Sequence, residues 1–125
     1  EEIEILGRIP FDEVSYYHNL LDVFLNVSVD DSESFGVAVV EAMACETPVI
    51  VSNVGGLKEV VEHGEFGIVV KKESAEEIAD AVEKIMKDES YVKTITAKAR
   101  EHVLRKYDFN VCLDKMIHIY KTHIN

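Results

Sequence analysis

The stretch Ser32-Glu33-Ser34-Phe35-Gly36-Val37-Ala38-Val39-Val40-Glu41-Ala42-Met43-Ala44 organises the rest of this 125-residue chain. From Phe35 to Cys45 the residues are apolar on every side of a helix, which predicts a helix buried from most directions. Glu41 is the only charged residue within that run. Because it is costly to remove an unpaired carboxylate from water, Glu41 needs a partner, either from the protein or from a ligand.

The residues just before this helix suit the binding of an anion. Ser32 or Ser34 can cap the helix, Gly36 leaves room for close approach, and the first N–H groups of a helix have no acceptor within it. Together with the helix dipole, such groups form a phosphate site. Glu41 follows Ser34 by seven residues, near two turns at ~3.6 residues per turn. We therefore expect Glu33 and Glu41 to face one cleft.

The spacing E-x7-E from Glu33 to Glu41, within E-S-F-G-V-x-x-x-E-A-M-A, resembles the donor-site signature of retaining family-four GT-B glycosyltransferases (group 1). The resemblance runs from about Ile3 to Tyr120 and implies that residues 1–125 are part of the C-terminal, nucleotide-sugar-binding domain of such an enzyme. It implies a catalytic role for Glu33, which would orient the sugar, and ribose binding by Glu41. The implied donor-binding residues are Ile9, Ser34, Phe35, Gly36, Val37 and Glu41.

The resemblance also implies a reaction. A hexosyl-type sugar would pass from a nucleotide diphosphate sugar to an acceptor with retention of configuration, as in polysaccharide biosynthesis, without a metal ion or another cofactor. The family's acceptor-binding N-terminal domain and its basic diphosphate clamp are missing from these residues, so we expect the chain alone to be inactive. The alternative is a non-catalytic α/β nucleotide-binding or interaction module, in which Glu41 only satisfies a neighbouring Lys or backbone group.

Composition sets further limits. Residues 1–70 carry 14 acidic and 2 basic side chains within a net charge of −11, which argues against nucleic acid as a partner. Cys45 and Cys112 lack metal-binding spacing and lie at apolar helical positions, so we expect buried free thiols in a reducing cytosol. No apolar run reaches the ~18–20 residues of a membrane span, and no signal peptide opens the chain. The start at Glu1, without Met, suggests a fragment.

Short apolar runs alternate with helical patterns, which predicts an α/β fold with a Rossmann-like parallel sheet of about four strands. The expected strands are Ile3–Leu6, Val23–Val27, Val49–Ser52 and Ile68–Val70, and the expected helices are Asp12–Leu21, Phe35–Glu46 and Leu57–His63. In the strand order that the resemblance implies, Ile3–Leu6 lacks its native neighbour. We expect it to pair with Val23–Val27 in a compact monomer, and the alternative is a homodimer joined through the exposed sheet edge.

The chain beyond Lys72 is predicted to be helical. Ser74 and Glu77 form a capping box, and Asp108 can cap a last helix whose apolar stripe we attribute to core packing. The helix at about Tyr91–Lys106 has a basic face, which indicates a solvated surface or, as the alternative, contact with anionic lipid. The free thiols and the lack of a membrane span or signal peptide indicate the cytoplasm as the expected location. The basic helix face gives the alternative for the full-length protein, which is peripheral association at the inner face of the membrane.

Three loops are ambiguous. Ile9 in Gly7-Arg8-Ile9-Pro10 is a nucleotide-base contact by the resemblance, or a core residue beside a plain turn. Asn53-Val54-Gly55-Gly56 resembles a phosphate loop, but tight packing explains it better. Asp30 and Asp31 are metal ligands or, as we favour, solvated loop acids. The five histidines match no catalytic or metal pattern and are expected to be surface or satisfied core residues.

Overall fold

The structure is a computed structural model that describes residues 2–124. Its helices and strands, in chain order, are η1 (Phe11–Glu13), α1 (Val14–Leu20), β1 (Phe24–Asn26), α2 (Val37–Ala44), β2 (Val49–Ser52), α3 (Leu57–Val60), η2 (Glu62–Gly64), β3 (Ile68–Val70), α4 (Ala75–Lys87), α5 (Glu89–Tyr107) and α6 (Phe109–His123). The α/β class is confirmed.

The sheet has three parallel strands in the order β1-β2-β3, so each strand lies beside its neighbour in the sequence. Phe24 pairs with Val49, and Ile50 pairs with Ile68. All four residues of β2 are buried, as expected of a central strand covered on both faces. The carboxyl ends of β1 and β2 lie at the same edge of the sheet, where ligands gather in folds of this kind.

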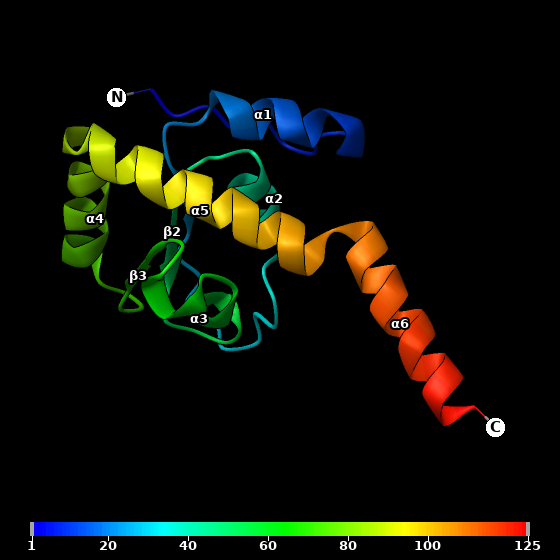
Figure 1. The fold of residues 1–125 in the computed structure, drawn as a ribbon. Helices are drawn as coiled ribbons and strands as arrows, with labels where there is room; N and C mark the ends of the chain where they lie inside the picture. Colours follow the sequence, from blue (N-terminus) through cyan, green and yellow to red (C-terminus); the bar gives the residue numbers. More distant parts are fainter. Residues whose placement is uncertain (1, 125) are drawn as a thin grey trace.

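Alternate residues of β2 enter two separate cores. Val49 and Val51 pack with α2, α3 and α5, while Ile50 packs with Ala81 and Ile85 of α4 on the opposite face. Figure 1 shows α5 crossing the molecule from the α4 side toward the chain end, with α2 behind it. The larger core therefore holds α2, the helix that was expected to be buried.

Two helix caps form where the sequence predicts them. The Ser74 hydroxyl accepts the Glu77 N–H (3.3 Å), and the Asp108 carboxylate accepts the Asn110 N–H (2.9 Å). The Glu77 side chain accepts the N–H of Lys71 (2.7 Å), whereas the Ser74 N–H donates to the Lys71 carbonyl oxygen (3.4 Å). Only the Ser74 half of the predicted capping box therefore forms.

The predicted strand at Ile3–Leu6 is wrong, and the sheet has three strands instead of about four. Residues 2–10 form no helix or strand, and the Ile3 and Ile5 side chains are 89% and 90% exposed. The compact four-stranded pairing with Val23–Val27 is therefore refuted. A short strand is stable only where a neighbouring strand pairs with it, and residues 2–10 pair with none of the described strands. The homodimer remains a prediction.

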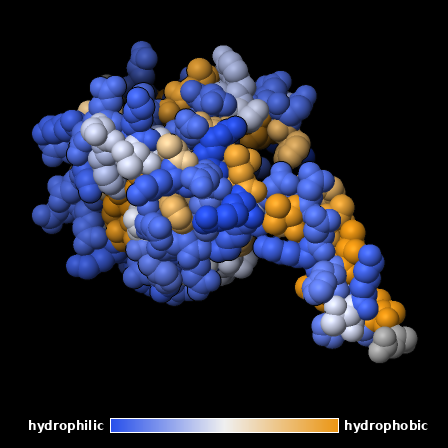
Figure 2. Space-filling model, in the orientation of Figure 1, coloured by the Kyte–Doolittle hydropathy of each residue, from blue (hydrophilic) through white to orange (hydrophobic). Residues whose placement is uncertain are grey.

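Core packing of the last helix is also wrong for this chain. None of the residues that the structure describes in α6 is buried, and Phe109, Met116 and Tyr120 are among its exposed apolar residues. The helix leaves the body of the molecule, and its apolar ridge is visible in the projecting arm of Figure 2. Cys112 on this helix is accordingly exposed, in contrast to the expected burial, while Cys45 is half-buried; both thiols are free. None of the helices between residues 2 and 124 is long and apolar enough to cross a membrane.

The buried His102 of α5 makes the stability of the fold depend on pH. Its ring stacks on Phe66 (4.3 Å between centroids), and burial, followed by the charge of Lys106, lowers its pKa below the usual value of 6.5. As the pH falls through ~6.5, the unfolded chain binds a proton that the folded chain does not, so folding weakens. We expect a smaller loss of unfolding free energy between about pH 7 and pH 5 in His102→Gln than in the wild type.

Urea unfolding at several pH values measures this difference, and the exposed His118→Gln provides a matched control that keeps the wild-type slope. Glu62, whose pKa is lowered chiefly by a hydrogen bond from Lys106, titrates below its ordinary value of 4.5 and so affects a more acidic range. Equal slopes in His102→Gln and the wild type would contradict the prediction.

Candidate functional site

The loop between β1 and α2 is anchored to the end of β2. The Ser52 hydroxyl donates to the Ser28 carbonyl oxygen (2.5 Å), and within the loop the Ser32 N–H donates to the Asp30 carboxylate (2.9 Å). This backbone hydrogen bond is the main reason that the pKa of Asp30 lies below its ordinary value. The loop that carries Glu33 is therefore ordered by contacts of its own backbone.

The Gly55-Gly56 turn supports the same loop. The Gly56 N–H donates to the Glu33 carbonyl oxygen at 2.9 Å. A Cβ atom on Gly55 would lie 1.9 Å from that oxygen, and one on Gly56 would lie 2.1 Å from the Ser34 carbonyl oxygen. Only glycines allow two backbones to approach so closely. The tight packing that the sequence favoured over a phosphate loop is therefore present at this turn.

The start of α2 differs from the expected serine cap. Gly36 occupies the cap position with a φ of 80°, and no side chain caps the helix, so neither Ser32 nor Ser34 has that role. A Cβ on Gly36 would also lie 2.6 Å from Leu57. The Gly36 carbonyl accepts the N–H of Val39 (3.0 Å), whereas the N–H groups of Val37 and Ala38 have no acceptor among residues 2–124. These free donors, together with the helix dipole, can hold an anion.

Glu41 lies at a cavity between α1 and α2. This cavity has a volume of about 330 Å³, and its lining includes Phe11, Ser15, His18, Glu41 and Cys45. The Glu41 side chain is 33% exposed, and one of its carboxylate oxygens lies 3.7 Å from the Nε2 atom of His18, which is buried. The carboxylate thus has both a protein partner and access to a space of the size that small ligands occupy.

The remaining predicted site residues lie along the same loop. Phe35 is 40% exposed and packs edge to face against Tyr107 at the end of α5 (5.5 Å between centroids). Ser34 and Val37 are exposed, and Glu33 is half-buried. Ile9 is half-buried before η1. Glu33 and Ile9 do not line the cavity that Glu41 shares with α1, so a common cleft for the two acids remains a prediction.

The loop acids behave as solvated side chains. Asp31 is 73% exposed and pairs with Lys72 (3.7 Å). Among residues 2–124, no three His, Cys, Asp or Glu side chains gather as metal ligands would.

Two neighbours of the site were missed from the sequence. His18 was expected to be an ordinary surface or core histidine, yet it faces Glu41 from a buried position. Its spacing from Val14 and Tyr17 places it on the inner face of α1, which was the available signal. Tyr107 lies more than seventy residues from Phe35, and no local pattern could join the two.

The fold and this site together define a Rossmann-like α/β domain in which α2 starts at the carboxyl ends of the strands, with first N–H groups that have no acceptor among the described residues. The chain belongs to the family of glycosyl transferases group 1, which matches residues 1–102. It is 35% identical over 120 residues to the capsular polysaccharide biosynthesis glycosyltransferase CapM of Staphylococcus aureus, covering 96% of this chain and 31% of CapM. The chain therefore spans about a third of the length of this relative.

Solved structures agree with this assignment. Sucrose-phosphate synthase from Thermosynechococcus elongatus matches 94% of this chain with a TM-score of 0.85 and 32% identity, over 29% of its own length. HepE of Anabaena, solved in complex with UDP, matches 85% of this chain with a TM-score of 0.80 and 25% identity, over 29% of its own length. The predicted resemblance to group 1 GT-B glycosyltransferases is confirmed.

The close contact between Gly56 and the loop that carries Glu33 can be tested by adding one methyl group to Gly56. Gly56 has an ordinary helical φ of −85°, so Gly56→Ala introduces a clash with the Ser34 carbonyl oxygen without backbone strain. We expect a loss of about 1–3 kcal/mol in unfolding free energy. The amide NMR resonances from Glu33 to Val37 should also shift.

Gly64→Ala is the matched control, because Gly64 has a φ of 105° but no atom within 4 Å of a new Cβ. That variant is strained yet should leave the Glu33–Val37 resonances unchanged. If Gly56→Ala also leaves them unchanged, the turn does not support the loop.

Proposed function

We propose that this chain is the nucleotide-sugar-binding half of a retaining glycosyltransferase, within a longer protein that also supplies an acceptor-binding N-terminal domain. The substrate would be a nucleotide diphosphate sugar, from which a hexosyl-type group passes to an acceptor with retention of anomeric configuration. Membership of the glycosyl transferases group 1 family supports the reaction class. The UDP complex of the structural neighbour HepE supports the donor class.

The observation that carries the proposal is the start of α2. The N–H groups of Val37 and Ala38 have no acceptor within the described chain, and the loop before them is fixed against the Gly55-Gly56 turn. As the bond between the sugar and the diphosphate breaks, negative charge grows on the leaving diphosphate. Fixed N–H dipoles stabilise such charge without reorganising, so this chemistry needs no metal ion in our proposal.

Glu41 and Glu33 have separate roles in the proposal. Glu41 borders the cavity between α1 and α2 and would accept hydrogen bonds from the ribose hydroxyls. Glu33 precedes the helix start and would orient the sugar beside the diphosphate. The backbone between the two glutamates would hold the diphosphate, through Ser34, Phe35, Gly36 and Val37. Ile9 would contact the base.

The negative charge of the chain explains why the site needs basic residues from elsewhere in the enzyme. Residues 1–70 contain 14 acidic and 2 basic residues, so a diphosphate is repelled on average. A helix start offsets this by only ~0.3–1 kcal/mol. We therefore propose that a basic diphosphate clamp comes from the portion of the enzyme outside this chain.

Replacing the two glutamates should separate their roles. In the whole transferase, Glu41→Ala should weaken donor binding by roughly ten- to a hundredfold, because a charge-assisted hydrogen bond contributes ~1.5–3 kcal/mol. Glu33→Ala should mainly lower kcat. Steady-state kinetics with the donor nucleotide sugar measure both effects.

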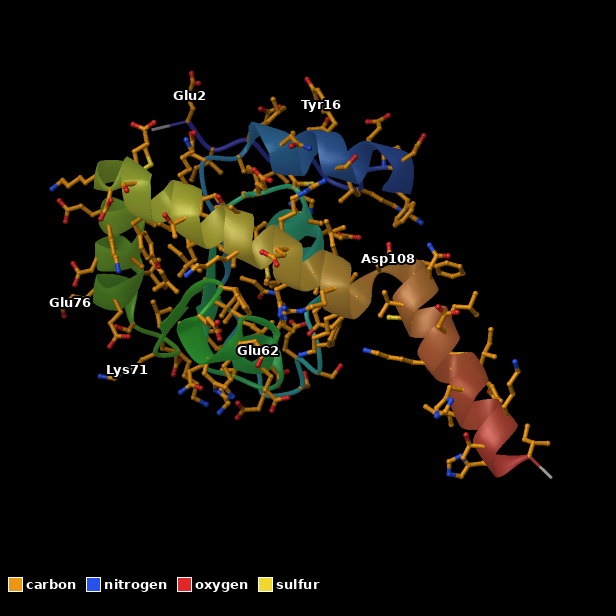
Figure 3. The ribbon with its side chains drawn as sticks, in the orientation of Figure 1. Glu2, Tyr16, Glu62, Lys71, Glu76 and Asp108 are labelled. Atoms are coloured by element: carbon orange, nitrogen blue, oxygen red, sulfur yellow. The ribbon has the colours of Figure 1, made fainter. Side chains whose placement is uncertain are left out.

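Glu76→Ala is the control, because Glu76 is an exposed residue of α4, far along the chain from the site, and the same charge is removed (Figure 3). Wild-type kinetics in both Glu41→Ala and Glu33→Ala would overturn the assignment of the site.

The chain by itself should lack transferase activity and bind nucleotide diphosphates only in the millimolar range or not at all, because no clamp offsets its acidic first part. Calorimetric titration with UDP and GDP tests this, and added salt should not weaken what binding there is, since it screens a net repulsion. Micromolar affinity would show that the chain contains its own clamp.

A further inference from the structure

Glu41, the proposed ribose ligand, lies beside a buried histidine. The His18 side chain is 7% exposed, and its Nε2 atom lies 3.7 Å from a Glu41 carboxylate oxygen. No Lys or Arg among residues 2–124 forms an ion pair with Glu41. Among the described residues, the basic group paired with this carboxylate is therefore the buried ring of His18 on α1.

His18 is held from several sides. Its ring packs edge to face against Phe24 of β1 (5.3 Å between centroids). Its carbonyl oxygen accepts the Thr47 hydroxyl at 2.7 Å in a buried hydrogen bond, which ties the end of α1 to the residues after α2. The ring is consequently fixed relative to both the sheet and the helix that carries Glu41.

The hydrogen-bonding state of the ring follows from these surroundings. The His18 Nδ1 atom is buried and has no hydrogen-bond partner among the described residues. If the proton were on Nδ1, a donor would be left unpaired, and the Nε2 lone pair would face the carboxylate and repel it. With the proton on Nε2, a donor lies 3.7 Å from the negative oxygen, and a small rotation of Glu41 would shorten the contact to a hydrogen bond of ~2.9 Å.

We propose that His18 is a positioning residue for Glu41: its Nε2–H holds one carboxylate oxygen against α1, so that the other faces the cavity and accepts the ribose hydroxyls of the donor. This inference rests on the proposed function, since it presumes that Glu41 binds ribose. A carboxylate has about four lone-pair sites, so one oxygen can serve His18 while the other serves the ligand. The side chain is thereby ordered before the ligand arrives, and less entropy is lost on binding.

The pair itself can be tested in the 125-residue chain without a ligand. Long-range proton–nitrogen NMR of the imidazole identifies the nitrogen that carries the proton. We expect it to be Nε2 in the wild type, and we expect Glu41→Leu, which removes the acceptor but keeps the bulk, to shift both ring-nitrogen resonances. A wild-type proton on Nδ1, or ring resonances unchanged in Glu41→Leu, would overturn the proposal.

The effect on ribose binding can be tested in the whole transferase with UDP and 2′-deoxy-UDP, or GDP and 2′-deoxy-GDP, as probes. The measured quantity is the ratio of the dissociation constants of the deoxy and ribose forms. We expect His18→Leu to lower this ratio about three- to tenfold, the equivalent of one lost hydrogen bond. His18→Gln, which retains an N–H donor, should keep most of the ratio, and the exposed His118→Leu should keep all of it.

The outcomes separate this inference from the proposed function. If His18 only stabilises the fold, His18→Leu lowers the melting temperature and weakens both probes equally, and an unchanged ratio would overturn the proposal for His18 alone. If Glu41→Leu leaves the ratio at its wild-type value, or if the wild type does not distinguish the two probes, the ribose role of Glu41 fails, and the proposal for His18 fails with it.

Discussion

The close approach of two backbones, Gly55-Gly56 to Glu33-Ser34, is the constraint on which the site depends. The Gly56 N–H bonds to the Glu33 carbonyl oxygen, and either glycine with a Cβ would clash with the loop. Because the first segment follows β2 and the second follows β1, this contact fixes the start of α2 relative to the sheet.

The burial of α2 then determines what the site can do. Val39, Ala42 and Met43 are completely buried, so the helix cannot rotate to expose Glu41 beyond the 33% that its side chain already shows. The hydrogen-bond partners of its carboxylate must therefore come from the α1 side, where His18 and the cavity lie. The packing that stabilises the fold thus also places the Glu41 carboxylate beside the buried His18 ring.

Local sequence patterns predicted most of the fold. The wrong and missed predictions concern segments whose structure depends on contacts with residues distant in the sequence. Strands β1, β2 and β3, helix α2 and the caps at Ser74 and Asp108 follow from periodicity and capping chemistry within a few residues. Ile3–Leu6 has a strand-like pattern, but a strand exists only where a neighbour pairs with it. The stripe of α6 likewise has the pattern of a packed helix, but none of the residues that the structure describes in α6 is buried. The loop glycines were recognised as packing residues, whereas the contacts of His18 and Tyr107 cross elements and leave no local signature.

A chain of aromatic and charged contacts connects the start of α2 to the projecting helix. Phe35 packs on Tyr107, Tyr107 packs on His102, and Lys106 bonds to Glu62 (2.6 Å). Tyr107 is the last residue of α5, and Asp108 begins α6 at the bend visible in Figure 3. The loop that precedes the free N–H groups therefore touches the same junction from which α6 departs. Since packed side chains cannot deform continuously, any partner that reorients α6 must either preserve the Tyr107–Phe35 contact or break it. The loop before α2 and the start of the projecting helix thus meet at one aromatic pair, Phe35 and Tyr107.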